Sequence, residues 1–149
     1  MFISNKISST VKQTIYVVVA HTVIFSAYCY AHGEVDPMYT TSSFLPILLF
    51  FGLGPLVAVF FLSTPSARHW AIVLIGTLMA ELLFNIYSKF IATSLLTLHQ
   101  PELIWEIIYE ALFGFLLILE VIGFWLTIKV LKEIHMQINS QDRTPVQKQ

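Results

Sequence analysis

Long apolar runs separated by short polar breaks dominate this sequence. The first run covers residues 14–31, and further runs cover residues at about 44–63, 70–97 and 103–131. Each is close to or above the roughly 20 residues that an α-helix needs to cross a bilayer. Because the breaks are short, consecutive helices are expected to pack as antiparallel neighbours. The pattern predicts an all-α integral membrane protein that folds as a small antiparallel helical bundle.

Composition agrees with this prediction and excludes several other classes of protein. Apolar residues make up 56% of the chain and charged residues 11%, against roughly 25% charged in soluble globular proteins. The net charge is −1, so no basic surface for nucleic acid is expected. The one cysteine, Cys29, cannot form a disulfide within the chain and matches no cysteine-rich metal motif. The expected partners are the lipid bilayer and other membrane-protein subunits or further copies of this chain.

Basic residues occur at alternate breaks along the chain. The loops at 32–43 and 97–102 contain no lysine or arginine and carry Glu34, Asp36 and Glu102. Lysine and arginine lie instead before the first run, after the second and from the end of the fourth onward, at Lys6, Lys12, Arg68, Lys129, Lys132, Arg143 and Lys148. Loops rich in these residues stay in the cytoplasm. We therefore expect a multi-pass protein of the cell inner (plasma) membrane, with a cytoplasmic polar tail at 132–149.

The N-terminal segment at 1–31 has two interpretations. Its basic start, its apolar middle and the small-x-small ending at Ala31 are typical of a cleaved signal peptide. Its apolar run is longer than the usual span of about 7–15 residues in such peptides, which favours a retained helix. Cleavage would leave a bundle of three mature transmembrane helices within residues 32–131, and retention would leave four.

Polar residues interrupt the third and fourth apolar runs. They are Glu81, Asn85, Ser88 and Lys89 in the third run, and Glu106, Glu110 and Glu120 in the fourth. At about 100° per residue, each set falls on one face of its helix. Lipid cannot solvate these groups, so the two faces are predicted to turn toward each other inside the bundle.

Depth in the membrane separates one pair of residues from the others. If residues 97–102 close a hairpin, Lys89 lies level with Glu110 and one turn from Glu106. Opposite charges at one level predict an ion pair, and its distance from the loop places it near one membrane surface.

A second group is predicted near the membrane centre. Glu81 lies within a turn of Glu120, with Asn85 one turn away and His21 at a similar depth if the first helix is retained. Two close carboxylates in a medium of low dielectric constant do not both ionise readily. Two roles remain open for this group: contacts that hold the helices together, or a proton or cation relay.

Two further features stand outside these groups. Pro55, with Gly52 and Gly54 before it, predicts a helix kink in the second run. On the outer side, His32 and His99 are candidate metal ligands. If cleavage makes His32 the first residue, its α-amine and ring nitrogen form a chelate that suits copper.

These features favour three hypotheses about function. The first is a non-enzymatic accessory or assembly subunit of a membrane complex, with no cofactor. The second is a transport component in which Glu81 and Glu120 carry protons or cations. The third is a periplasm-facing protein that handles copper or nickel through His32 and His99. An enzyme is not expected, because the sequence contains no zinc-protease, nucleophile-elbow or phosphate-loop motif.

Overall fold

Four long helices account for nearly all of the residues that the structure describes. The structure is a computed structural model and describes residues 8–35, 45–92 and 103–142. The helices that are long and apolar enough to cross a membrane are Ser9–Val35, Leu45–Ser63, Ala67–Phe90 and Leu103–Ser140. The predicted all-helical fold is confirmed for these residues.

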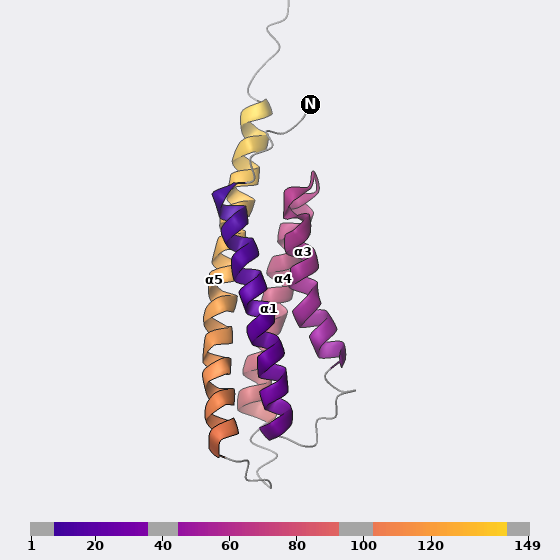
Figure 1. The fold of residues 1–149 in the computed structure, drawn as a ribbon. Helices are drawn as coiled ribbons and strands as arrows, with labels where there is room; N and C mark the ends of the chain where they lie inside the picture. The colour runs from indigo at the N-terminus through magenta and orange to yellow at the C-terminus, as the bar shows by residue number, and fades with distance from the viewer. Residues whose placement is uncertain (1–7, 36–44, 93–102, 143–149) are drawn as a thin grey trace, which may run out of the picture.

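The elements follow the apolar runs of the sequence, with local departures from α-helical geometry (Figure 1). They are α1 (Ser9–Val35), the π-helical η1 (Leu48–Leu53), α3 (Gly54–Phe60), the 3₁₀-helical η2 (Phe61–Ser63), α4 (Ala67–Tyr87), the π-helical η3 (Ser88–Ala92) and α5 (Leu103–Asp142). The first part of the predicted polar tail, residues 132–142, is therefore the end of α5. Leu131 and Ile134 pack against buried residues of the bundle, which explains why the helix continues beyond the apolar run.

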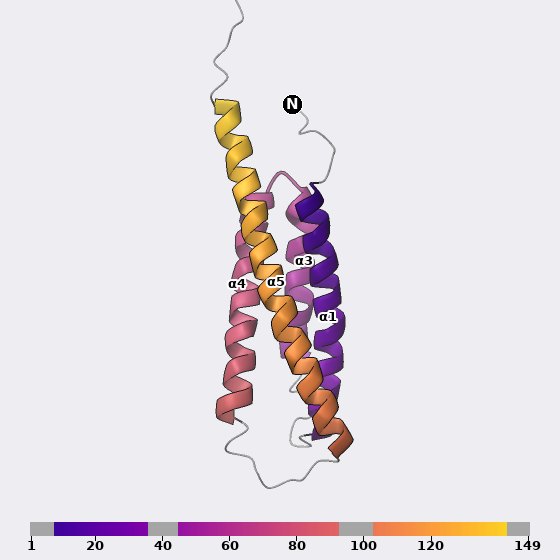
Figure 2. The same ribbon diagram turned by 90° about the vertical axis from the view of Figure 1, so that its left-hand side faces the viewer.

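The helices form an antiparallel bundle in which each helix reverses the direction of the one before (Figures 1 and 2). α1 and α4 each pack against both α3 and α5, so α1 and α4 face each other across a diagonal. The basic end is the end of the bundle that holds Lys12, Arg68, Lys129 and Lys132. The opposite end is where α1 finishes and α5 begins. Figure 2 shows α5 extending past the other helices at the basic end.

Two apolar cores fill the bundle, one toward each end. The basic-end core consists of Val11, Val18, Ala58, Val59, Leu62, Ala71, Leu74, Leu78 and Val130. The opposite-end core is richer in aromatic rings and consists of Phe25, Tyr28, Cys29, Ala31, Tyr109, Phe113 and Leu116. α1 contributes to both cores, with Val18 in the first and Phe25 in the second. The segment between these two residues contains His21, so a polar layer separates the cores.

Next to the predicted kink at Pro55, the second apolar run contains the π-helical turn η1, which ends directly before Gly54. Pro55 has no backbone N–H to donate to the preceding turn. The hydroxyl of Thr22 on α1 lies 3.2 Å from the carbonyl oxygen of Gly52 and donates to it. A Cβ atom at Gly52 would lie 3.6 Å from the Phe25 ring, an ordinary van der Waals distance, so this part of the second helix lies close to α1.

The start of α1 is held by α5 at the basic end. The hydroxyl of Ser8 accepts a hydrogen bond from the backbone N–H of Val11 and donates one to Glu133 at 2.8 Å. Thr10 also donates to the Glu133 carboxylate. A carboxylate next to a helix N-terminus interacts favourably with the positive end of the helix dipole. These contacts fix the position of α1 along the length of α5.

Candidate functional site

A cluster of four polar side chains lies in the middle of the bundle. His21 comes from α1, Glu81 and Asn85 from α4, and Glu120 from α5, and each is at most 1% exposed. The His21 Nε2 atom lies 3.0 Å from Glu81 Oε1. Asn85 Nδ2 donates a hydrogen bond to Glu120 Oε1 at 2.6 Å. The structure thus brings together the four residues that the sequence analysis placed near the membrane centre, which we call the central cluster.

Helix packing explains how three helices reach one point. Glu81 and Asn85 are four residues apart and share one face of α4. His21 meets Glu81 across the diagonal of the bundle, because α1 and α4 do not lie side by side. Gly123, one turn after Glu120, would place a Cβ atom 3.3 Å from the Leu78 side chain. The missing side chain there lets α5 lie close to α4.

The central cluster has more polar atoms than internal hydrogen bonds. Within the described residues, no hydrogen-bond partner is present for either ring nitrogen of His21, either carboxylate oxygen of Glu81, Asn85 Oδ1 or Glu120 Oε2. The approach of His21 to Glu81 is short, but it lacks the alignment of a hydrogen bond. Each unsatisfied buried polar group costs about 1–3 kcal/mol. If these side chains only held the helices together, we would expect more of their buried polar atoms to have hydrogen-bond partners.

The charges of the central cluster do not balance when both glutamates are ionised. Two carboxylates then face one imidazole in an apolar interior, where an uncompensated charge is costly. The ring of His21 stacks on Phe25, with centroids 6.1 Å apart and planes 9° from parallel. This contact restrains the imidazole orientation. The arrangement favours a cation among these side chains.

A second polar contact, between η3 and α5, lies nearer the opposite end. Lys89, in η3 directly after α4, forms an ion pair with Glu110. The Lys89 ammonium also lies 4.9 Å from the centre of the Tyr109 ring, within the range of a cation–π contact. Glu106 is exposed and does not belong to this pair.

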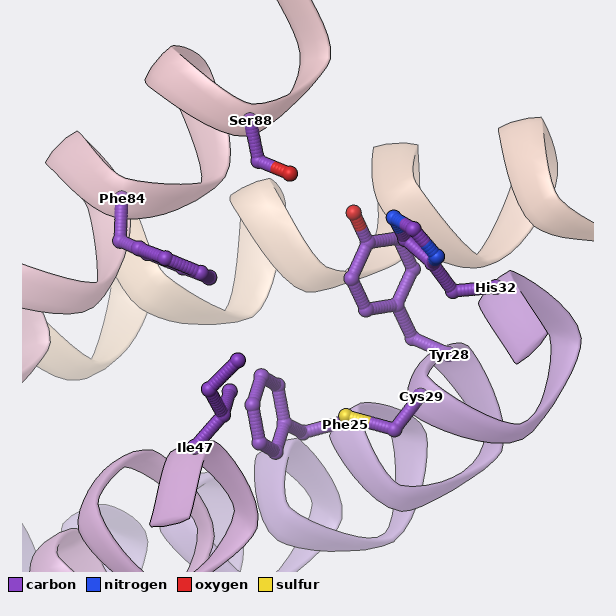
Figure 3. A pocket seen from close by; sticks show the side chains of 7 residues that line it. All are labelled: Phe25, Tyr28, Cys29, His32, Ile47, Phe84 and Ser88. Carbon is purple, nitrogen blue, oxygen red and sulfur yellow. The ribbon is translucent and has the colours of Figure 1, made fainter. Parts of the chain in front are cut away.

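Polar side chains continue from the central cluster toward the opposite end. The hydroxyl groups of Tyr28 and Tyr109 are 3.0 Å apart and buried. A pocket of about 20 Å³ lies beside Tyr28, enough for about one water molecule. Figure 3 shows this pocket, with the hydroxyl of Ser88 directed into the space beside Tyr28. Its lining residues are Phe25, Tyr28, Cys29, His32, Ile47, Phe84 and Ser88.

Toward the basic end, the buried side chains of the described residues offer no comparable polar route. The fully buried polar residues there are Thr14 and Thr127. Thr14 donates to the carbonyl oxygen of Thr10, and Thr127 donates to that of Gly123, each within its own helix. The remaining buried side chains there are apolar. The central cluster is therefore approached by polar groups from the opposite end.

His32, one of the two predicted copper ligands, lies apart from the central cluster. His32 is in the last turn of α1, where its ring contacts those of Tyr28 and Tyr109 edge-on, at 6.1 and 5.3 Å between centroids. His99 lies outside the described residues. Sequence reasoning missed the contact between Tyr28 and Tyr109. Tyr28 is seven residues after His21, two helical turns along the same face, and this spacing was the available signal.

Comparison with protein-family models, curated proteins and solved structures gives no match.

Proposed function

We propose that this chain is a small, non-enzymatic, multi-pass protein of the inner (plasma) membrane that binds a cation in its central cluster. The observation that carries the proposal is the set of buried nitrogen and oxygen atoms of His21, Glu81, Asn85 and Glu120 that lack hydrogen-bond partners. A cation would bind such oxygen and nitrogen atoms and balance the charge of the two carboxylates.

Membrane insertion is supported by apolar side chains that face outward on all four long helices. Val23, Phe60, Leu83 and Val121 are 59–76% exposed. Apolar surface this extensive is typical of proteins in contact with lipid or another subunit. The basic end then faces the cytoplasm, because it holds Lys12, Arg68, Lys129 and Lys132.

Packing supports retention of α1 as a fourth transmembrane helix. α1 supplies His21 to the central cluster, Val18 to one core and Phe25 to the other. Cleavage after Ala31 would remove these side chains and uncover Glu81 and Glu120. Intact-mass analysis of protein from native membranes tests this point: we expect a mass that includes α1, and a mature chain that begins at His32 would contradict it.

The polarity of the two halves supports exchange of the cation with one side of the membrane. The Tyr28 hydroxyl and the adjoining pocket lie toward the opposite end, while the basic-end core is apolar. Because the basic-end core is apolar, the described residues favour binding of a cation over its conduction across the membrane. It suits an accessory subunit that accepts a cation from the outer face within a larger membrane complex.

Thermal unfolding of the full-length protein in mild detergent tests the proposal. After treatment with a chelator, the protein is heated in the presence of Na⁺, K⁺, Mg²⁺, Ca²⁺, Mn²⁺ or Zn²⁺ at one ionic strength. We expect at least one cation to raise the unfolding temperature, because a ligand that binds only the folded state stabilises it. The double variant Glu81→Gln/Glu120→Gln should lose this response.

The matched control is Lys89→Gln/Glu110→Gln, which alters the same two helices outside the central cluster. It should keep the response of the wild type. If no cation raises the unfolding temperature, or if both double variants respond alike, the proposed function is wrong.

A further inference from the structure

We infer that the cation is a divalent first-row transition metal ion held by His21, Glu81 and Glu120. This inference rests on the proposed function and names the chemistry of the ion. One ligand atom from each of these residues lies within 4.8 Å of the other two. Each residue comes from a different helix, so the ion would join α1, α4 and α5 at one point.

The spacing of the ligand atoms fits an ion of this size. A transition metal binds imidazole nitrogen and carboxylate oxygen at about 2.0–2.2 Å, and tetrahedral ligands are then about 3.3 Å apart. The 3.0 Å between His21 Nε2 and Glu81 Oε1 is already close to this value. Glu120 Oε2 has no hydrogen-bond partner in the described structure, so its side chain can turn toward the ion without breaking a contact of that atom.

Charge favours a divalent ion over a monovalent one. Two carboxylates carry a charge of −2, and a neutral imidazole adds none. A divalent ion gives a site with no net charge when both glutamates are ionised, while Na⁺ or K⁺ leaves one negative charge buried or requires one glutamate to take up a proton. In an apolar bundle, the neutral site has the lower desolvation cost.

The ligand types favour a transition metal over Ca²⁺ or Mg²⁺. Calcium takes about 6–8 oxygen ligands, and magnesium keeps several waters in octahedral geometry. Imidazole is a preferred ligand of zinc and its neighbours, and carboxylate also suits manganese. The combination of His21 with Glu81 and Glu120 therefore fits a transition metal ion such as Zn²⁺ or Mn²⁺ better than Ca²⁺ or Mg²⁺.

Neighbouring residues hold the ligands in place. Asn85 Nδ2 donates to Glu120 Oε1, which restrains that carboxylate and leaves Oε2 for the ion. Phe25 stacks on the His21 ring. Partners of this kind orient metal ligands, and their loss typically lowers metal affinity about 10–100-fold. Asn85 Oδ1 also lacks a hydrogen-bond partner in the described structure.

Metal retention by the full-length protein tests the inference. Chelator-treated protein in detergent is dialysed against Zn²⁺ or Mn²⁺ and then analysed by mass spectrometry for bound metal. We expect about one ion per chain, as for a single site with three protein ligands. Glu120→Gln should weaken retention at least about tenfold, since it alters a ligand rather than only its neighbour. Glu110→Gln, the same change on the same helix outside the site, should retain metal as the wild type does.

A spectroscopic measurement on the wild type makes the test independent of whether the variants fold. Electron spin-echo spectroscopy of the Mn²⁺-loaded protein should detect a histidine nitrogen bound to the metal. Absence of that nitrogen signal, absence of retained metal, or equal retention in Glu120→Gln and Glu110→Gln would each overturn the inference. Stabilisation by Na⁺, K⁺, Mg²⁺ or Ca²⁺ alone would leave the proposed function standing and reject the transition metal.

Discussion

Two polar contacts join α4 and the following η3 to α5, and they differ most in burial. In the central cluster, Asn85 donates to Glu120, and both side chains are at most 1% exposed. Nearer the opposite end, Lys89 pairs with Glu110, and their side chains are 18% and 51% exposed. Both contacts arise from polar residues that interrupt apolar runs. Their surroundings nevertheless give them different energetic roles.

The difference shows that the role of a charged residue in an apolar run depends on the side chains that surround it. Lys89 and Glu110 balance each other, and the Tyr109 ring adds a cation–π contact. The opposite charges of this pair therefore balance without a further ion. In the central cluster, His21 faces two glutamates and several polar atoms lack hydrogen-bond partners. The first arrangement is complete as a contact between helices, and the second is better explained as a binding site.

Removing the imidazole from the central cluster should give the largest loss of stability. In His21→Ala, Glu81 loses the imidazole whose Nε2 atom lies 3.0 Å from Glu81 Oε1. A buried polar group left without a partner costs about 1–3 kcal/mol, and the cavity left by the ring adds to this loss. Denaturant unfolding in mild detergent, with Val23→Ala as an exposed control on the same helix, measures the effect. A loss as small as that of the control would contradict the account.

Replacing the whole central cluster with apolar residues should have the reverse effect on stability. Exchange of buried charged groups for well-packed apolar ones is often neutral or stabilising by about 1–4 kcal/mol. We therefore expect a variant with leucine at positions 21, 81, 85 and 120 to fold, and to show no response to cations. Unfolding of this variant in the absence of cations would show that the cluster is needed to hold the bundle together.

Loss of one hydroxyl beside the pocket should have an intermediate effect. Tyr28→Phe breaks the contact with the Tyr109 hydroxyl, and a hydrogen bond of this kind contributes about 0.5–1.5 kcal/mol. Thermal unfolding measures the loss, with Tyr30→Phe as control because Tyr30 is 64% exposed. Equal effects of the two substitutions would mean that the buried hydroxyl contact adds nothing to stability.

The smallest effect is expected at the partly exposed pair. Lys89→Gln/Glu110→Gln should lower the free energy of unfolding by less than about 1 kcal/mol, since solvent screens exposed ion pairs. Raising the salt concentration should reduce the difference from the wild type further. A loss as large as that of His21→Ala would remove the contrast between the two contacts.

Much of this contrast could be predicted from helical periodicity. A spacing of four residues places Glu81 and Asn85 on one face of α4, and the length of the hairpin places Lys89 level with Glu110. The prediction was possible because charged residues are few in these apolar runs and lipid cannot solvate them. Each charged residue was therefore expected to face the inside of the bundle, where few partners are available.

Other contacts depend on three-dimensional packing that periodicity does not contain. His21 reaches Glu81 across the bundle diagonal, which follows from the order in which the helices pack. The hydrogen bonds from Ser8 and Thr10 to Glu133 join positions more than 120 residues apart. A position on one helix face predicts that a residue turns inward, but it does not predict which helix it meets.

Cation binding measured side by side in three proteins tests the central claim most directly. The three are the wild type, the variant with leucine at positions 21, 81, 85 and 120, and Lys89→Gln/Glu110→Gln, each titrated with Zn²⁺ by calorimetry in the same detergent. We predict equal binding by the wild type and the Lys89→Gln/Glu110→Gln variant, and none by the leucine variant. Binding by all three proteins, or by none of them, would contradict the assignment of a transition-metal site to the central cluster.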